Sequence, residues 1–538
     1  MAQPAPVSAL SNRQILRAAL VVLLGFVASG VLGVLRTAII AARFGAGDAL
    51  DAFFRAQQLP EMIFVLVAGG ALGSSFIPVY ARARAQDETG AWRLASAAMT
   101  LSALAAGALG ALVFLLAPLI TGHILAPQVT PELQALTSDL MRAMMLTPLV
   151  FSISGLLMGL LHAHQRFLLP SLAISMNSIG LIIGALLIAP ALPPVPGAAQ
   201  VGDANVHGLA WGAVLSALLH LLVQLPGLRG LGAQLRPLAD WSSPALRDVL
   251  RLMGPRVLGL AVARVNFLVN AAFTSAMIAG SLTALSTAFT LLFFALGVIG
   301  QSLGSALFPT LSTLAAGGDM DGFRDRLVSA LRGALFLAFP AMLLLILLGE
   351  PLVKTLFERG QWSAESSAAT AWALAFYASG MAGFVLLELL SRAFYALEDS
   401  RTPVLVGVAT MLANILLSLI FIRLIGEPGN LARGPFAGLA LANALATNVE
   451  ALVLWWLLRR RLGNLDEAGF LRSAPALLLA CAGLGIAVGL WLGQAQSPLT
   501  QLLGGGGIGL AVFLGLGMLL RLEEARALPR LLPARLQD

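Results

Sequence analysis

The sequence carries little charge. Asp, Glu, Lys and Arg make up only 11% of its 538 residues, whereas a typical soluble domain has about 25%. Apolar residues account for 58% of the chain, and the mean hydropathy is +0.89. A water-soluble globule of this composition would expose large apolar patches and aggregate. The composition therefore excludes a soluble enzyme, a disordered chain and a nucleic-acid-binding domain, and it predicts a polytopic membrane protein.

Residues that build metal, disulfide and catalytic sites are also scarce. Cys481 is the one cysteine, so a disulfide framework and a cysteine-based metal site are excluded. The five histidines are scattered along the chain, so we expect no metal and no cofactor. No Ser/His/Asp, HExxH or paired-carboxylate arrangement falls on a shared loop. We therefore expect no catalytic residue and predict that the protein is not an enzyme.

Long apolar runs are what the chain does have. A transmembrane helix requires about 20 such residues, and about fourteen stretches of this kind predict an all-α membrane protein. The predicted spans lie near residues 17–42, 54–79, 94–119, 136–161, 168–189, 208–226, 252–278, 283–312, 329–349, 366–390, 402–423, 434–457, 473–493 and 504–520. The second and eighth contain proline or clustered glycines, as a bent helix facing a cavity would.

The basic residues set the predicted orientation. All but one of the 33 are arginines, Lys354 being the exception. Most fall in the loops and span ends that share a side with the N-terminus, and such loops are typically cytoplasmic. The sequence therefore predicts a multi-pass membrane protein with both termini in the cytoplasm. We expect it to act as a monomer among membrane lipids, without nucleic acid.

The chain repeats itself at an offset of about 231 residues. The segments Leu72–Ser74 and Gly208–Ala210 recur as Leu303–Ser305 and Gly438–Ala440. Each match holds the same place in a block of six spans, and parallel six-helix repeats form two lobes around a central site. We predict an N-lobe at residues 1–228, a C-lobe at 229–462, and two additional helices with a cytoplasmic tail at 463–538.

Charged residues inside spans mark candidate binding sites because they are costly in lipid. Arg36 and Arg55 are candidates for a cationic phosphate site, since guanidinium groups bind phosphate oxygens in pairs. Alternatively, Arg55 pairs with Asp51 four residues earlier. The first two spans and the turn between them hold the densest polar set, which is Arg36, Asp51, Arg55, Gln57, Gln58 and Glu61.

Two further groups of polar residues lie in the second half. Arg264 and Asn270 in the seventh span are expected to line the cavity, or else to bond to other helices. Glu388 is a candidate proton-coupling carboxylate, with pairing to Arg392 as the alternative. Asn414 together with Asn270 is a candidate for a cation site that couples transport to an ion gradient.

Several motifs resemble the MurJ/MviN family of the MOP flippase superfamily. The resemblance covers residues 15–460, with the last two spans present as in the family. In order along the chain, its motifs are Val31-Leu32-Gly33-Val34-Leu35-Arg36, Phe44-Gly45-Ala46-Gly47, Asp51-Ala52-Phe53-Phe54, Leu59-Pro60, Phe76-Ile77-Pro78, Phe308-Pro309-Thr310-Leu311-Ser312, Glu358-Arg359-Gly360, and Phe394-Tyr395-Ala396 with Asp399 and Thr402-Pro403.

The resemblance implies a multi-pass flippase of the bacterial plasma (inner) membrane for lipid II, the undecaprenyl-pyrophosphate-linked peptidoglycan precursor. It implies two lobes that rock about a cationic cavity and a groove for the lipid tail on the last two spans. The family's cavity arginines map only partly onto this chain. Arg36 is retained, and Asn270 matches the family pattern, whereas other family charges fall on Gly30, on Phe64–Val65, on Gly69 and on Thr290, and a basic position falls on Glu388.

These departures keep other functions open. One is a flippase for a different polyprenyl-linked saccharide, with the positive site rebuilt from Arg36, Arg55 and Arg264. Another is a multidrug exporter of the same superfamily, related to the MATE transporters. A third is a membrane scaffold that transports nothing.

Overall fold

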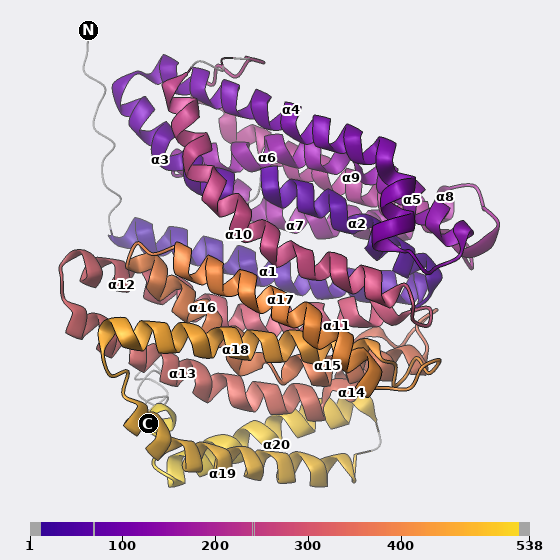
Figure 1. The fold of residues 1–538 in the computed structure, drawn as a ribbon, viewed down its shortest axis with the longest axis vertical. Coiled ribbons are helices and arrows are strands. Elements are labelled where there is room, and N and C mark those ends of the chain that lie inside the picture. The colour runs from indigo at the N-terminus through magenta and orange to yellow at the C-terminus, as the bar shows by residue number, and fades with distance from the viewer. Residues whose placement is uncertain (1–11, 68–69, 239, 241–242, 496, 527–538) are drawn as a thin grey trace. The chain divides into compact units, whose positions relative to one another are not determined.

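A computed structural model describes residues 12–67, 70–238, 240, 243–495 and 497–526. The described chain is almost wholly helical (Figure 1), which confirms the all-α fold class. Helices are the natural solution for these apolar runs because a helix satisfies its own backbone hydrogen bonds in lipid. Contacts divide the chain into two compact units, Met1–Ala279 and Gly280–Asp538.

The first unit contains ten α-helices and one small β-hairpin among its described residues. The hairpin pairs β1 (Gln200–Val201) with β2 (Ala204–Asn205). The helices are α1 (Asn12–Phe44), α2 (Asp48–Val67), α3 (Gly70–Gln86), α4 (Glu88–Ile120), α5 (Pro131–Met144), α6 (Leu146–Ala163), α7 (Leu168–Ile183), α8 (Ala189–Ala191), α9 (His207–Leu222) and α10 (Pro244–Thr274). Short π or 3-10 turns lie at Thr121–Leu125, Gly184–Ile188, Gly197–Ala199 and Leu225–Leu228.

The second unit is also helical throughout its described residues. Its helices are α11 (Ser281–Leu296), α12 (Ser302–Ala316), α13 (Met320–Leu347), α14 (Gly349–Phe357), α15 (Ala364–Ala378), α16 (Met381–Ala396), α17 (Arg401–Leu424), α18 (Phe436–Leu462), α19 (Glu467–Leu492) and α20 (Pro498–Leu519). A π turn at Gly297–Gln301 separates α11 from α12. The last two helices pack on each other and on α13 and α14, where Phe336, Leu484, Val488 and Phe513 are buried together.

Small residues allow α7 and α9 to approach closely. A Cβ atom added at Gly184 would lie 2.7 Å from the Cα of Gly212, and one at Gly180 would lie 2.4 Å from the backbone nitrogen of Ser216. Apolar side chains gain little by leaving lipid, so contacts between small residues are a main source of helix association in membranes. Larger side chains at these glycines would force the two helices apart.

The clustered glycines predicted in the eighth span fall on a π turn at Gly297–Gln301, between α11 and α12. The predicted bend of the second span falls at residues 68–69, outside the described residues, and stays a prediction. The tenth span has a bend that the sequence does not predict. Its two helices, α15 and α16, meet at an angle of 50°. That break falls at Ser379–Gly380, and a Cβ at Gly380 would lie 2.8 Å from the Cα of Ala444.

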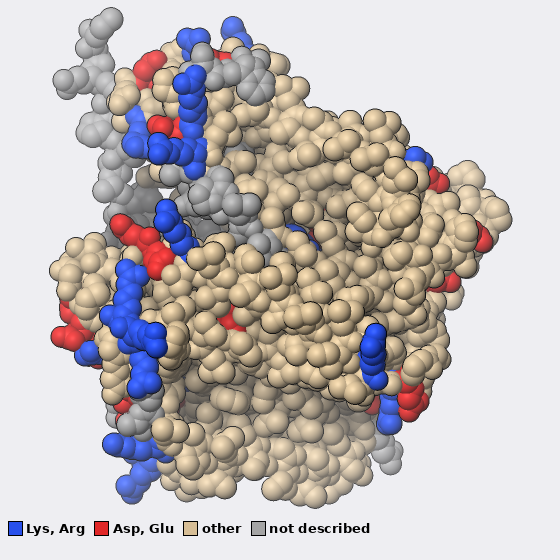
Figure 2. Space-filling model, viewed as in Figure 1, with Lys and Arg blue, Asp and Glu red and all other residues tan. Residues whose placement is uncertain are grey.

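Ten described helices are long and apolar enough to cross a membrane, or up to eleven if the bent α15–α16 pair is one span. The other three predicted spans fall on α1, α2 with α3, and α10, so the count of fourteen stays a prediction. On the face drawn in Figure 2, much of the described surface carries no charge, and the charged side chains gather in small groups.

The predicted lobe boundaries also stay a prediction. The contact division places α10 in the first unit, where it packs on α2 and α3. The boundary predicted at 228/229 marks instead where the sequence repeat begins. A helix can belong to the second repeat by sequence and to the first unit by its contacts.

Asp399 fixes the turn between α16 and α17. Its carboxylate accepts hydrogen bonds from the Thr402 backbone nitrogen at 3.0 Å and from the Thr402 hydroxyl at 2.8 Å. It also pairs with Arg461 at 3.2 Å, and Arg461 donates a second bond to the Leu397 carbonyl. The spacing of Asp399 and Thr402 in the sequence motif therefore has a physical cause, which is the capping of α17.

These contacts make the stability of the turn depend on pH. Partial burial raises the pKa of Asp399, but the hydrogen bonds from Thr402 and the charge of Arg461 outweigh it, so the pKa is lowered overall. The ionised form therefore stabilises the fold at neutral pH, and this stabilisation disappears as the pH falls through the lowered pKa. We expect Asp399→Asn to lower the melting temperature at pH 7 and to have little effect in strong acid. The control is Glu398→Gln at the neighbouring exposed acid, and an equal loss in that variant would contradict the prediction.

Candidate functional site: an arginine and glutamate cluster

Arg264 and Glu61 join α10 to α2 within the first unit. The guanidinium of Arg264 donates to Glu61 Oε2 at 2.9 Å, and the two side chains are 30% and 40% exposed. Gln57, one turn earlier on α2, donates from its amide to the other carboxylate oxygen. The guanidinium of Arg264 also lies over the ring of Phe267 at 5.6 Å. The charged pair is thus held in place but remains open to a ligand.

Arg36 of α1 completes this cluster. Its side chain is half-buried, and Glu61 lies close enough for a favourable charge interaction. Arg264 pairs with Glu61 directly, whereas Arg36 interacts with it only through its charge, so the Arg36–Glu61–Arg264 cluster carries one excess positive charge. An anion that displaced Glu61 would meet two arginines in a partly desolvated place, where charge-assisted hydrogen bonds are strong.

Arg55 and Asp51 lie elsewhere and are fully buried. They form an ion pair at 3.5 Å across one turn of α2, with exposures of 3% and 1%. Arg55 also donates to the carbonyl of Thr274 at the end of α10, at 3.3 Å. The sequence predicts this pairing as the alternative to ligand binding, and a ligand role for either residue stays a prediction.

Asn270 lies near that buried pair. It is 9% exposed, and its backbone carbonyl accepts the hydroxyl of Thr274 at 2.7 Å. The five predicted binding residues therefore separate into two groups. Arg36 and Arg264 belong to the open cluster, whereas Asp51, Arg55 and Asn270 belong to the buried contact between α2 and α10.

The sequence predicts no role for Glu61. The available signal was an acid inside a predicted span, which needs a cation nearby. Arg36 and Arg264 are on other helices, and the sequence does not say which way three helices are turned about their axes. The structure supplies that information, because Glu61 pairs with Arg264 and lies close enough to Arg36 for a charge interaction.

The predicted coupling residues lie in the second unit. Glu388 pairs with Arg392 one turn later on α16, where Nε donates to Oε1 at 3.0 Å. Gly304 of α12 leaves room for this guanidinium, because a Cβ there would lie 2.8 Å from Nε. Asn414 is buried in α17 beside Ser418, whose hydroxyl is 3.5 Å from its side-chain oxygen. Both coupling roles stay predictions, and within the described residues no group of three or more His, Cys, Asp or Glu side chains could hold a metal ion.

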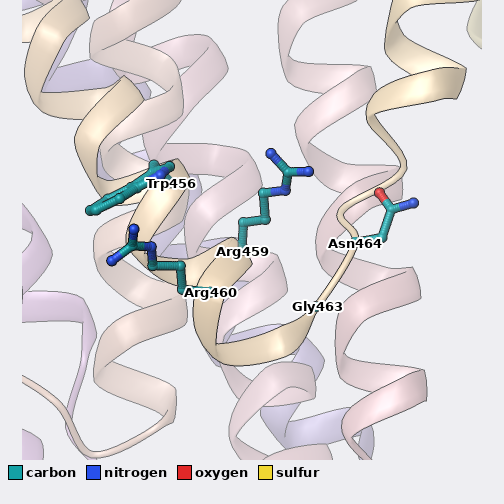
Figure 3. Close-up of a pocket in the computed structure, with 5 residues that line it drawn as sticks. All are labelled: Trp456, Arg459, Arg460, Gly463 and Asn464. Carbon is teal, nitrogen blue, oxygen red and sulfur yellow. The ribbon is translucent and has the colours of Figure 1, made fainter.

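A second basic site lies at the end of α18 (Figure 3). This pocket of about 420 Å³ is lined by Trp456, Arg459, Arg460, Gly463 and Asn464. The guanidinium of Arg460 lies 3.6 Å from the ring centre of Trp456, which orients it. The pocket sits where the sequence predicts the cytoplasmic membrane surface, and its groups suit an anionic headgroup.

The fold and the cluster together define a class of protein. Long apolar helices in two units, with charged residues held among them, are characteristic of membrane transporters. The sequence profile described as lipid II flippase MurJ matches residues 40–500. The chain belongs to this family, and it is a multi-pass protein of the bacterial inner membrane.

Individual relatives agree with this assignment. The lipid II flippase MurJ of Burkholderia cenocepacia is 30% identical over 487 residues, which cover 88% of this chain and 90% of that protein. A probable lipid II flippase MurJ of Vibrio cholerae is 27% identical, covering 82% of this chain and 83% of its own length.

Solved structures show the same fold. A lipid II flippase MurJ in an inward closed conformation aligns with a TM-score of 0.76 at 21% identity, covering 94% of this chain and 99% of that one. An inward-facing MATE multidrug transporter of the MOP superfamily aligns with a TM-score of 0.67 at 15% identity, covering 81% and 96%. At these identities the likeness concerns the fold alone.

Proposed function

We propose that this protein moves lipid II, the undecaprenyl-pyrophosphate-linked peptidoglycan precursor, across the inner membrane by alternating access. The observation that carries the proposal is the Arg36–Glu61–Arg264 cluster. It has excess positive charge, it is partly exposed, and it joins the consecutive helices α1 and α2 to the distant α10. A pyrophosphate offers the oxygens that two guanidinium groups bind, and the prenyl chain can remain in lipid.

Glu61 acts in this proposal as an internal counter-ion. Without substrate it neutralises part of the cluster and limits the cost of holding two arginines among apolar helices. The pyrophosphate displaces the carboxylate from Arg264, and Gln57 keeps Glu61 close by. When the substrate leaves, Glu61 returns, which favours release on the far side of the membrane.

The proposal also includes the orientation of the chain and its division into lobes. Both termini are in the cytoplasm, because the basic residues gather at that end of the predicted spans. The lobes are residues 1–228 and 229–462, and α19 and α20 are an addition that accommodates the lipid tail. Glu388 and Asn414 stay predicted coupling residues, and the protein acts as a transporter without a cofactor.

Rescue of bacteria depleted of their own lipid II flippase tests this function. Expression of this gene is expected to restore growth and cell shape, because the substrate is the same lipid. Membrane expression of a tagged copy is the control. Failure to rescue despite normal membrane expression would contradict the proposal.

Native mass spectrometry then separates the remaining alternatives. Retention of a polyprenyl-pyrophosphate lipid of another saccharide would identify a flippase with a different substrate. Drug resistance conferred by the gene, without any bound lipid-linked sugar, would identify an exporter. A protein that does neither would be a scaffold.

A further inference from the structure

Glu450 is an acidic side chain in the middle of an apolar helix. It lies roughly 20 Å from either end of α18, at about 1.5 Å per residue. Leu445, Val449 and Leu452 on the same helix are exposed and apolar, as residues that face lipid would be. An acid at this depth needs a specific reason, because intramembrane charges are costly and usually functional.

The carboxyl group of Glu450 faces α17, which lies beside α18 (Figure 1). Its Oε2 atom is 3.0 Å from the hydroxyl oxygen of Thr410. A Cβ atom at Gly407 would lie 3.3 Å from Oε1, so glycine leaves room for the carboxyl group against the backbone of α17.

Glu450 differs from the other acids held among the helices. Asp51, Glu61 and Glu388 each pair with an arginine. Within the described residues, no basic side chain pairs with Glu450. The titratable group near it is Tyr395 of α16, which also has a charge interaction with Glu388. α17 presents Thr410 and Gly407, and the described parts of α11 and α15 bring no charged side chain to it.

These surroundings favour the protonated form of Glu450. An ionised carboxylate with one hydrogen bond in an apolar place costs several kcal/mol, whereas a protonated carboxyl group does not carry that charge. The Thr410 hydroxyl has one proton, and its oxygen also lies 3.0 Å from the Val406 carbonyl. When Glu450 is protonated, its O–H can donate to Thr410 while Thr410 donates to Val406. When Glu450 is ionised, Thr410 donates to the carboxylate.

We propose that Glu450 is an intramembrane proton-binding site that carries its proton at neutral pH. When Glu450 loses its proton, the Thr410 hydroxyl stops donating to the Val406 carbonyl of its own helix and donates instead to the Glu450 carboxylate on α18. Proton binding and the contact between α17 and α18 are thereby linked. The proposal concerns the second unit alone and does not depend on which substrate the protein moves.

A hydrophobic carbodiimide tests this directly. Dicyclohexylcarbodiimide adds to a protonated carboxyl group in an apolar place. The carboxyl oxygen bonds to the central carbon, the proton passes to nitrogen, and the adduct rearranges to a stable N-acylurea with no atom lost. The purified protein in phosphatidylcholine vesicles is labelled at neutral and at alkaline pH, digested, and analysed by mass spectrometry.

We expect Glu450 to be labelled at neutral pH and labelling to decline at alkaline pH. Glu388→Gln is the matched control and should leave this adduct unchanged, whereas Glu450→Gln should remove it. Thr410→Val removes the hydroxyl that stabilises the carboxylate, so labelling should persist to higher pH, whereas Thr410→Ser should resemble the parent.

Infrared difference spectra provide a second measurement. Subtracting the Glu450→Gln spectrum from that of the parent at neutral pH should reveal the C=O stretch of one protonated carboxyl group. A carboxylate band there instead, or a Thr410→Val variant whose titration equals the parent's, would overturn the proposal. If Glu450→Gln does not fold, the comparison of Thr410→Val with Thr410→Ser decides alone.

Discussion

Replacing Arg264 with glutamine is expected to reduce transport of the pyrophosphate-linked lipid by about ten- to a hundredfold. A hydrogen bond to a charged group is worth about 1.5–3 kcal/mol, and each 1.4 kcal/mol is about tenfold in an equilibrium constant. Arg264 is partly exposed and pairs across helices, so its loss weakens the anion site more than the fold. Arg36→Gln should act in the same direction. For both variants, the measurements are transport of the lipid into vesicles and lipid retention in native mass spectrometry.

Arg142 supplies the matched control for the arginine variants. It is also a partly exposed arginine within a predicted span, pairing with Asp139 at 3.4 Å and lying over the ring of Phe114. Arg142→Gln should leave transport near the parent level. Equal activity of the Arg264→Gln, Arg36→Gln and parent proteins, at equal amounts in the membrane, would show that the cluster does not bind the substrate.

Glu61→Gln separates the counter-ion role from simple charge pairing. Removing the carboxylate leaves both guanidinium groups available, so lipid retention should increase while transport slows at release. If Glu61 merely supported the fold, Glu61→Gln would weaken binding and transport together. The melting temperature of each variant accompanies these measurements, so that lost folding is not read as lost binding.

Much of the fold follows from the sequence because lipid imposes simple rules. Long apolar runs must be helical, and the clustered glycines of the eighth span mark its π turn. The sequence did not predict the bend at Ser379–Gly380, since this bend depends on a close approach to Ala444, a residue far along the chain. Sequence patterns do not report contacts of that kind.

The candidate site shows the same limit. Composition and spacing identified Arg36 and Arg264 as charges inside spans, but not their common partner Glu61, because helix rotation is set by packing. For Arg55 and Glu388 the sequence allowed either a ligand or coupling role or a local pair, and the structure contains the local pair in both cases. Glu450 has no partner within its own helix, and Thr410 can be identified as its partner only once α17 and α18 are placed together.

Breaking the buried pair of Asp51 and Arg55 is expected to destabilise the protein by about 3–5 kcal/mol, because the partner left behind is a buried and uncompensated charge. Asp51→Asn and Arg55→Met should each lower the yield of folded protein and the free energy of unfolding in detergent. Combining Asp51→Leu with Arg55→Met removes both charges. It should recover much of the loss, since apolar replacement of a buried ion pair is often neutral or stabilising.

An exposed pair with the same spacing is the control for this experiment. Glu350 and Lys354 are also four residues apart, at 2.7 Å, but their exposures are 53% and 32%. Glu350→Gln should cost less than about 1 kcal/mol, as is usual for pairs in water. The contrast also decides the role of Arg55. If Arg55→Met folds as stably as the parent yet no longer transports, then Arg55 binds the substrate and the buried pair opens during the cycle. If Arg55→Met is destabilised and the double variant regains both stability and transport, the pair is structural, and the positive charge for the pyrophosphate comes from Arg36 and Arg264.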